Sequence, residues 1–217
     1  YITGHKEFYG LDLTVDSRVL VPRPDTETLV DWALEVLTST PGTEGSDLTA
    51  PLKTRVIDLG TGSGAIALAL KHARPSLQVS AVDFSADALT VARSNAERMK
   101  LDVAFSQGSW LDGVSGHFDA IVSNPPYIAA ADQHLAALTH EPLQALASGN
   151  DGLDDIRAII RQAPQRLSPG GWLLLEHGYD QAATVRALLT TAGLKNAQSR
   201  RDLAGIERCS GARLPIT

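Results

Sequence analysis

The amino-acid sequence predicts an α/β protein: a mostly parallel sheet of seven strands with one antiparallel edge strand, preceded by a short β-hairpin. Two observations support this prediction. Through the middle of the chain, short apolar runs without a helical period alternate with amphipathic segments, as in parallel strands joined by helices. Near the C-terminus, the strand-like residues 196–200 and 205–211 are too close together for a helix between them. These two segments must therefore pair as an antiparallel hairpin.

The composition is that of an ordinary globular protein. The 217 residues, 43% hydrophobic and 20% charged, suffice for one large α/β domain with at most a small appendage. The net charge of −6 disfavours a protein that binds nucleic acid directly. The single cysteine, Cys209, excludes an internal disulfide and fits a reducing compartment, so we expect a cytoplasmic protein. No apolar run approaches the roughly 20 residues that span a bilayer, so we expect no membrane association.

Residues 1–24 are predicted to form a β-hairpin and a linker, and residues 25–217 to form the main domain. Residues 8–15 alternate between apolar and polar side chains around Gly10, a pattern typical of a hairpin. The sequence begins at Tyr1 instead of an initiator methionine. We therefore expect that residues are missing upstream, and with them a whole further domain.

A helix is predicted just after the hairpin, because apolar residues recur at helical spacing up to Leu37. Pro24 cannot lie inside this helix, and Asp25 or Thr26 is expected to cap its first turn. Residues 41–51, rich in glycine, serine, threonine and proline, are predicted to form a surface loop.

A glycine-rich turn follows the first predicted strand of the sheet, residues 55–59. Its glycines allow backbone N–H groups to approach a ligand closely, and the helix that follows adds positive charge at its N-terminus. The spacing G-x-G-x-G is tighter than that of dinucleotide-binding turns, which favours a nucleoside ligand without a diphosphate. A tight turn without any ligand is the alternative. The candidate ligand-binding residues of this turn are Gly60, Thr61, Gly62, Ser63 and Gly64.

Further candidates lie at the ends of the next two predicted strands. The strand at residues 79–82 ends at Asp83, about 20 residues beyond the first glycine, where a carboxylate can bind ribose hydroxyls. Phe84 follows directly and joins this candidate group. Trp110 lies just beyond the third predicted strand, residues 101–105. Its ring can either stack on the planar base of a ligand or pack in the protein core.

The fourth predicted strand, residues 118–122, runs into the sequence Asn124-Pro125-Pro126-Tyr127. The prolines have no N–H and favour extended backbone, so a stiff loop forms at the edge where parallel sheets bind ligands. The Asn124 side-chain oxygen and the Pro125 carbonyl can each accept an N–H, and Tyr127 can cover a planar face. This loop therefore suits a flat substrate group that carries NH₂. A plain turn after a core strand is the alternative.

The remaining segments continue the alternation of helices and strands. A strand is predicted at residues 172–176, after a break at the sequence Ser-Pro-Gly-Gly of residues 168–171. Residues 149–152 are predicted to form a turn. Helices are predicted over residues 85–98, 129–138, 153–167 and 181–192.

Three of these motifs together resemble those of class I methyltransferases that modify planar NH₂ groups: residues 58–64, residues 82–83 and residues 124–127. Among these enzymes the chain closely resembles the N5-glutamine methyltransferases of peptide chain release factors, the HemK/PrmC family. Residues 23–27 favour this branch over the related enzymes that act on a glutamine of a ribosomal protein. Further support comes from residues 8–11, 21–22, 141–142 and 151–153.

The resemblance implies a Rossmann-like methyltransferase fold, S-adenosylmethionine as cofactor with S-adenosylhomocysteine as product, and a release factor's GGQ glutamine as substrate. It also implies an upstream helical domain that recognises the substrate, which agrees with the missing start. His177, where the family usually has isoleucine, is a small departure. Cofactor binding is assigned to the glycine-rich turn with Asp83, Phe84, Trp110 and Asn124. Substrate binding is assigned to Asn124, Pro125, Pro126 and Tyr127, and catalysis to Asn124, Pro125 and Tyr127.

Other functions stay open on the sequence alone. A methyltransferase acting on the amino group of adenine or cytosine in nucleic acid would use the same loop, but the acidic net charge disfavours it. A nicotinamide-dependent dehydrogenase is disfavoured by the glycine spacing. A non-catalytic module that binds S-adenosylmethionine is a third alternative. We expect a monomer, and no metal site, because the six histidines are scattered.

Overall fold

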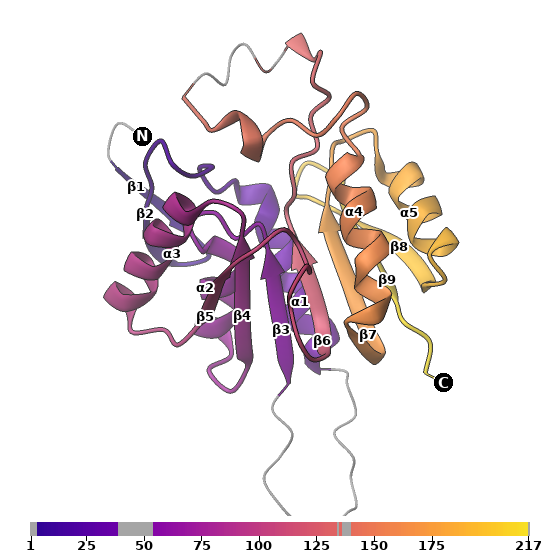
Figure 1. Ribbon diagram of the computed structural model, residues 1–217, viewed down its shortest axis with the longest axis horizontal. Helices are drawn as coiled ribbons and strands as arrows, with labels where there is room; N and C mark the ends of the chain where they lie inside the picture. Colours follow the sequence, from indigo (N-terminus) through magenta and orange to yellow (C-terminus); the bar gives the residue numbers. More distant parts are fainter. Residues whose placement is uncertain (1–3, 39–53, 134, 136–139, 217) are drawn as a thin grey trace, which may run out of the picture.

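A sheet of seven strands forms the centre of the protein in the computed structural model, which describes residues 4–38, 54–133, 135 and 140–216. The strand order is β5-β4-β3-β6-β7-β9-β8, with helices on both faces (Figure 1). This order confirms the predicted seven-stranded, mostly parallel sheet. The strands are β3 (Arg55–Leu59), β4 (Gln78–Asp83), β5 (Ala104–Gln107), β6 (Phe118–Ser123), β7 (Leu167–Glu176), β8 (Lys195–Arg201) and β9 (Glu207–Arg213).

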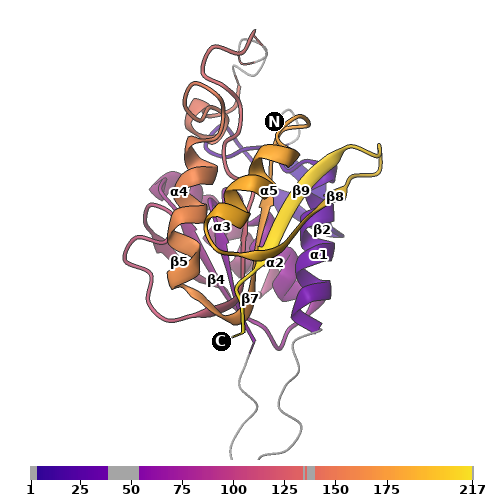
Figure 2. The ribbon, with the colours of Figure 1, turned by 90° about the vertical axis from the view of Figure 1, so that its right-hand side faces the viewer.

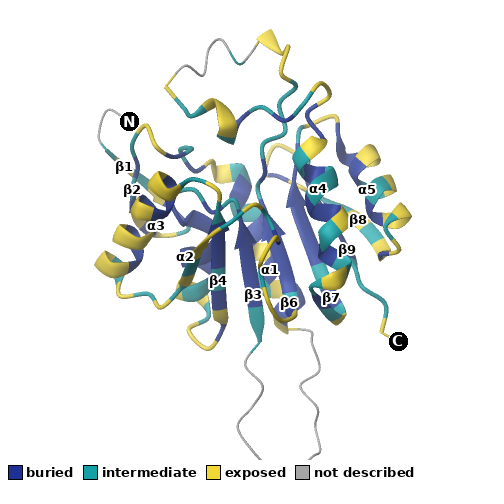
Figure 3. Cartoon of the chain, in the orientation of Figure 1, coloured by how far each residue is buried: buried dark blue, intermediate teal, exposed yellow. Residues whose placement is uncertain are grey.

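Alternate residues of the central strands pack into two separate hydrophobic cores, because successive side chains of a strand point to opposite faces of the sheet. Val56 and Val122 join the core beneath α1, α2 and α3, whereas Ile57 and Ile121 join the core beneath α4 and α5. The two helical layers lie on opposite sides of the sheet (Figure 2), and the strands between them are buried (Figure 3). The helices are α1 (Glu27–Thr38), α2 (Ala65–Ala73), α3 (Ala86–Met99), α4 (Asp154–Gln162) and α5 (Ala182–Thr191).

The predicted N-terminal hairpin is present as β1 (His5–Phe8) and β2 (Leu11–Thr14), which pair antiparallel. Its apolar side chains belong to the same core as α1, α2 and α3. The buried amide of Asn95 in α3 secures the hairpin: its Oδ1 accepts the N–H of Thr14, and its Nδ2 donates to the carbonyls of Thr14 and Ser63. The hairpin is therefore fixed to α3 and, through Ser63, to the glycine-rich turn.

The antiparallel strand is β9, and it does not lie at the edge of the sheet as predicted. It pairs with β7 on one side and with β8 on the other, so β8 forms the edge. Burial explains this arrangement. Cys209, Ser210 and Ala212 of β9 are fully buried, whereas β8 has the polar sequence KNAQSRR, which suits an exposed edge.

The prediction that a helix covers residues 153–167 is wrong at its C-terminal end. The helix α4 ends at Gln162, and a short 3₁₀ turn, η4 (Ala163–Gln165), follows because Pro164 has no N–H to continue the helix. The strand β7 already begins at Leu167 and contains the Ser-Pro-Gly-Gly sequence at a register shift, where a proline is tolerated.

Three smaller predictions also differ from the structure. The third strand covers Ala104–Gln107, not residues 101–105. Neither Asp25 nor Thr26 caps α1, because Pro24–Thr26 form a 3₁₀ turn, η1, ahead of it. Of the predicted helix at 129–138, the described residues form no α-helix: residues 130 and 131 lie in a turn, and residues 133 and 135 have 3₁₀ geometry. The remainder of that helix, like the predicted loop at 41–51, lies outside the described residues.

The other predicted elements are confirmed, including the Ser85-capped helix α3, the turn at 149–152 and the final hairpin. The Ser85 side chain accepts the N–H of Ala88. Within the described part of the chain, no helix has the length and apolar character needed to cross a membrane. The division between residues 1–24 and 25–217 stays a prediction.

Candidate active site

The candidate site lies where the chain changes direction in the sheet. From β3 the strands run outward to β4 and β5, and β6 then returns to the other side of β3. The carboxyl ends of β3 and β6 therefore meet at a switch point, the place where open α/β sheets bind ligands. The Ser123 hydroxyl at the end of β6 donates to the Leu59 carbonyl at the end of β3, at 2.7 Å. Residues 128–133 and 140–152 rise above this edge of the sheet (Figure 1).

Two adjoining cavities open at this edge, and Asn124 lines both. The first, which we call the turn cavity, has a volume of about 230 Å³ and is lined by Gly60, Gly62, Asp83, Phe84, Trp110 and Pro126 among others. The second, which we call the loop cavity, has a volume of about 140 Å³ and is lined by Leu20, Arg23, Pro125, Tyr127, Ile128, Ala145 and Leu146. The predicted cofactor and substrate residues thus fall largely into two neighbouring spaces.

The backbone of the glycine-rich turn adopts a conformation that favours glycine. Gly60 has a φ of +71°, and its N–H donates to the Val82 carbonyl of β4 at 2.8 Å. A side chain on Gly60 would also meet the Trp110 ring, since an added Cβ would lie 3.2 Å from it. Trp110 therefore packs directly against the turn and completes one wall of the turn cavity.

The buried Asp58 side chain stabilises this turn by hydrogen bonds. Its Oδ2 accepts the Thr61 hydroxyl at 2.6 Å and the N–H of Ala67 at 3.3 Å. Burial raises the pKa of Asp58 to about 7. Thr61, Ser63 and Gly64 do not line the turn cavity; Thr61 bonds to Asp58, and Gly64 lies at the start of α2. Of the five turn candidates, only Gly60 and Gly62 face the cavity.

Asp83 lines the turn cavity at the end of β4, as the sequence predicted. Its two oxygens accept the N–H groups of Gly62 at 2.8 Å and of Ser85 at 2.9 Å. Burial raises the pKa of this carboxyl above its ordinary value. Phe84 follows on the rim with 71% of its surface exposed. This ring is free to cover a ligand in the turn cavity.

Asn124 has one side-chain atom bonded and one free. Its Nδ2 donates to the hydroxyl oxygen of Thr26 at 3.3 Å. Thr26 lies in the 3₁₀ turn η1, directly before α1. Its Oδ1 is buried and accepts no hydrogen bond from any described residue. A buried polar atom without a partner costs about 1–3 kcal/mol. The amide oxygen is therefore prepared for a donor that a ligand brings.

Tyr127 is held in the wall of the loop cavity by the turn at 149–152. The Gln181 side chain donates to its carbonyl at 3.1 Å. Gly152 packs so closely that an added Cβ would lie 2.2 Å from the same carbonyl oxygen. Burial raises the pKa of the Tyr127 hydroxyl, so the phenol stays neutral at physiological pH.

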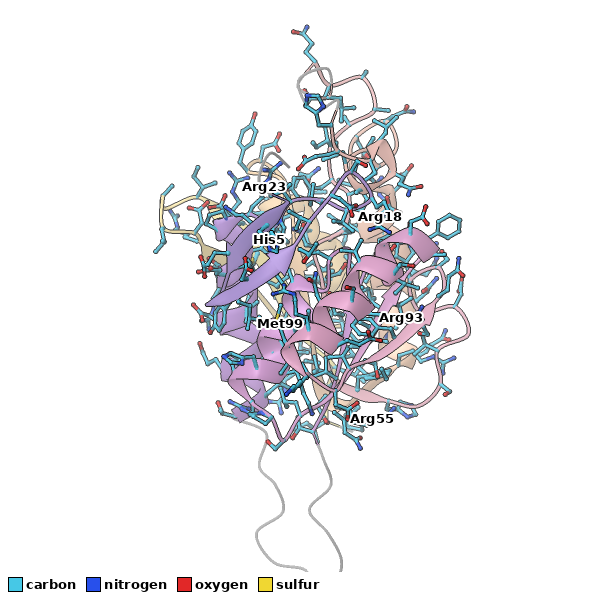
Figure 4. The ribbon with its side chains drawn as sticks, turned by 90° about the vertical axis from the view of Figure 1, so that its left-hand side faces the viewer. His5, Arg18, Arg23, Arg55, Arg93 and Met99 are labelled. Carbon is cyan, nitrogen blue, oxygen red and sulfur yellow. The ribbon has the colours of Figure 1, made fainter. Side chains whose placement is uncertain are left out.

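An ion pair lies beside the loop cavity, which Arg23 lines. The Arg23 guanidinium bonds to both carboxylate oxygens of Glu141, at 2.9 and 2.8 Å, and Glu141 also accepts the Val21 N–H. The Glu141 side chain is only 6% exposed. Arg18 and Arg23 lie at the same end of the molecule, and Arg55, at the start of β3, lies at the opposite end (Figure 4). The pair thus joins the N-terminal segment to residues 141–146.

Two side chains of this site were not found by sequence reasoning. Thr26 is 3% exposed and contacts Asn124, and Glu176, at the end of β7, is 1% exposed. Burial raises the pKa of Glu176 to about 7. One feature of the sequence could have pointed to Glu176: it is the last residue of a predicted strand, and the carboxyl ends of parallel strands meet at one edge of the sheet. For Thr26, no signal in the local sequence pointed to this contact.

Comparison with known proteins shows the family to which the chain belongs. The family model of the methyltransferase small domain matches residues 45–149. A release factor glutamine methyltransferase of Coxiella burnetii is 46% identical over 215 residues, covering 98% of this chain and 74% of the relative. One of Xylella fastidiosa is 48% identical over 219 residues, covering 99% and 76%. A methyltransferase structure from Pyrococcus furiosus shares the fold, with a TM-score of 0.67 at 20% identity over 95% of this chain and 90% of that one. The chain belongs to the release factor glutamine methyltransferase family.

Proposed function

We propose that this chain transfers a methyl group from S-adenosylmethionine to the side-chain nitrogen of a glutamine in a peptide chain release factor. The observation that carries the proposal is the buried Oδ1 of Asn124, an acceptor to which no described residue donates, where the two cavities meet. A carboxamide substrate brings the N–H group that this oxygen lacks. The names of the relatives, which are similar over nearly the whole chain, support the same substrate.

The turn cavity fits the proposed cofactor. Its wall combines bare glycine backbone, the Asp83 carboxylate, and the rings of Phe84 and Trp110. Glycine admits the ligand close to the backbone, the carboxylate can accept from ribose hydroxyls, and an aromatic ring can stack on the adenine. When bound, S-adenosylmethionine supplies an electrophilic methyl group on a positively charged sulfur.

The residues of the loop beyond β6 position the substrate. An amide nitrogen is a weak nucleophile because its lone pair is delocalised into the carbonyl. As this nitrogen gains a methyl group, the methyl–sulfur bond would break to leave S-adenosylhomocysteine, and the N–H groups become more acidic and bond more strongly to Asn124 Oδ1 and the Pro125 carbonyl. One of these N–H protons is then lost to solvent, which leaves a neutral methylated amide. Interactions that strengthen in the transition state raise the rate more than they raise substrate affinity. The neutral Tyr127 ring covers the planar amide, and Pro126 joins the loop to the turn cavity.

The same proposal includes the setting in which the chain works. We infer that it acts as a monomer in the cytoplasm on a protein substrate, without direct contact to nucleic acid. The net charge of −6 supports the absence of contact to nucleic acid, and the single, buried cysteine supports a reducing compartment.

Mass spectrometry of a release factor incubated with the chain and S-adenosylmethionine tests the proposal. We expect one added methyl group on one glutamine, and none when the cofactor is omitted. A ribosomal protein and a DNA or RNA substrate in parallel incubations test the competing substrates. Methylation of either of these, with none on the release factor, would contradict the proposed substrate.

A further inference from the structure

The side chain of Gln181 joins three separate segments of the chain beside the loop at residues 124–127. Gln181 directly precedes α5, and its side chain is buried. Its Oε1 accepts the N–H of Gly178 at 2.8 Å. Its Nε2 donates to three backbone carbonyls, at 3.1, 3.4 and 3.5 Å: those of Tyr127, Asp151 and Gly152. One amide group thus connects the loop, the turn at 149–152 and the segment that leads from β7 into α5.

Hydrogen-bond polarity allows only one orientation of this amide. A backbone N–H can only donate, and a backbone carbonyl can only accept. The Gly178 N–H therefore requires the Gln181 oxygen on its side, and the three carbonyls require the NH₂ group on theirs. The opposite orientation would set two donors against each other at Gly178 and two acceptors against each other at Tyr127.

Gly178 is itself held in place, so the Gln181 oxygen has a fixed donor. The Gly178 carbonyl accepts the Gln181 backbone N–H at 3.1 Å and lies 2.9 Å from Nδ1 of His177. Because a carbonyl only accepts, Nδ1 of His177 carries the proton in this contact. An added Cβ at Gly178 would lie 3.1 Å from the Gln181 side-chain oxygen, so the packing here is close. The segment after β7 is therefore a firm support for the Gln181 side chain.

The Tyr127 carbonyl is the end of the loop on which this support acts. At the other end, the Ser123 hydroxyl bonds to the Leu59 carbonyl. Two prolines lie between these points, and their rings fix φ, so the loop has little freedom once both ends are held. Gln181 lines neither cavity, whereas Tyr127 lines the loop cavity. Gln181 therefore acts on a bound substrate only through the loop.

We propose that Gln181 is a positioning residue, which holds the loop at residues 124–127 in place for the substrate by bonding to the Tyr127 carbonyl. The inference deepens the proposed function and rests on it. The two acceptors for the substrate nitrogen, Asn124 Oδ1 and the Pro125 carbonyl, belong to this loop. Without the bond from Gln181, the loop loses one of its fixed ends, and the acceptors lose their alignment with the transferred methyl group. The rate of methyl transfer then falls, because small displacements of reacting groups are costly.

Replacement by glutamate tests this role, because it keeps the shape of the side chain and removes its donor. In Gln181→Glu the ionised carboxylate can still accept from Gly178, but it repels the three carbonyls. We expect kcat for a release factor to fall at least about tenfold at about pH 8. The Kd of S-adenosylmethionine, measured by calorimetry, should change only a few-fold. The control Gln165→Glu adds the same charge at an exposed position just before the opposite end of β7, and it should keep its rate.

Low pH should restore activity in Gln181→Glu. A protonated glutamic acid has an O–H donor for the Tyr127 carbonyl and keeps one oxygen that accepts from Gly178. Burial beside carbonyl oxygens raises the pKa of a carboxyl, so the rate of this variant relative to the unsubstituted chain should rise several-fold between about pH 8 and about pH 6. The ratio cancels the titration of nearby groups that both proteins share, among them His177, Asp151 and Asp180.

A second substitution shows whether the recovery comes from the hydrogen bond. Gln181→Met has a similar length and forms neither bond at any pH, so it should show the loss of rate without the recovery. A near-normal kcat in Gln181→Glu at about pH 8 would overturn the proposal. The proposal would also be overturned if the rate of Gln181→Glu stayed low in the same proportion at every pH.

A measurement without turnover separates this inference from the proposed function. In protein with ¹³C-carbonyl tyrosine and ¹⁵N isoleucine, the Tyr127 carbonyl signal is read through the N–H of Ile128 and assigned by its loss in Tyr127→Phe. The signal should move upfield in Gln181→Met, because loss of a hydrogen bond shields the carbonyl carbon, and should stay in place in Gln165→Glu. A signal that does not move in Gln181→Met would overturn the proposal even where methyl transfer occurs. If the signal moves but the unsubstituted chain methylates no release factor, the bond to the loop is supported and the proposed substrate fails.

Discussion

Asn124 combines a donor that is bonded within the protein and an acceptor that is not. Replacement by alanine removes the acceptor without disturbing the glycine-rich turn. We expect Asn124→Ala to lower kcat at least about 100-fold, the loss typical of removing one preorganised hydrogen bond to a transition state. Binding of S-adenosylmethionine, measured by calorimetry, should change only a few-fold. Asn150→Ala, in an exposed turn, is the control. A near-normal kcat in Asn124→Ala would refute the role of this oxygen.

Asp83 bonds to the backbone and also lines the turn cavity, so we propose that it has both a structural and a binding task. Its carboxylate accepts the N–H groups of Gly62 and Ser85 while it lines the turn cavity. Asparagine in its place would set a donor NH₂ group against one of these N–H groups. Asp83→Asn should therefore weaken S-adenosylmethionine binding at least tenfold by calorimetry, whereas Asp87→Asn, on the exposed face of α3, should bind normally. Equal affinity in both variants would exclude Asp83 from the cofactor site.

The sequence pointed to Asn124 and Asp83 because each follows a recognisable strand and lies in a distinctive local motif. It did not reveal Thr26, which lies 98 residues from Asn124 in the sequence and close to it only in the fold. Local pattern also could not show that Thr61 would turn inward to Asp58 while Gly60 and Gly62 line the cavity. Contacts between distant segments are settled by packing, and no local signal encodes them.

The turn at 149–152 supports the loop at residues 124–127 by close backbone packing. Gly152 has a φ of +75°, and an added Cβ would lie 2.2 Å from the Tyr127 carbonyl oxygen, so alanine is both strained and blocked. Gly152→Ala should displace Tyr127, lowering kcat for methyl transfer at least tenfold and the free energy of unfolding by about 1–3 kcal/mol. Gly113→Ala tests positive φ without a close contact and should keep its activity. Normal turnover in Gly152→Ala would mean that the loop tolerates displacement.

One ion pair, between Arg23 and Glu141, joins the N-terminal segment to residues 141–146. Removing the carboxylate in Glu141→Gln leaves the Arg23 guanidinium without its partner and weakens the bond to Val21. Because Glu141 is almost fully buried, we expect a coupling energy of about 1–3 kcal/mol between Arg23 and Glu141 in a double-mutant cycle on stability. The KM for the release factor should rise in both single variants. A coupling energy near zero would show that the pair does not hold these two segments together.

At the level of elements, prediction succeeded where the periodicity was clear and failed where one proline or one pairing choice decided the outcome. The buried strands and the Ser85-capped helix follow directly from apolar patterning and capping. Helix α4 ends early because of Pro164. The apolar residues continue at helical spacing past this proline, so the pattern predicted a longer helix. The position of β9 inside the sheet could not be predicted, because either strand of a hairpin can pair with its neighbour until burial selects the more apolar one.

Across the whole molecule, the two cores require strict alternation along each central strand, so a one-residue slip would exchange their side chains. This requirement fixes the carboxyl ends of β3, β6 and β7 relative to one another. It therefore also brings Asp58, Asn124 and Glu176 to one edge. The fold holds two of these groups as buried carboxyls whose pKa values are raised to about 7.

These two carboxyls make the stability of the whole fold depend on pH. Each pKa is higher in the folded than in the unfolded state, so the folded state binds more protons between about pH 4 and pH 7. Their stabilising contribution is complete below the unfolded pKa and is lost as pH rises through the folded pKa. The full loss is on the order of 3–4 kcal/mol for each group. Urea unfolding of the cofactor-free chain should therefore give a lower free energy of unfolding at pH 8 than at pH 5.5. Glu176→Gln should reduce this difference, whereas the control Glu97→Gln, on the exposed face of α3, should leave it unchanged. A free energy of unfolding that is constant or rises toward pH 8 would show that the carboxyls are not buried as acids.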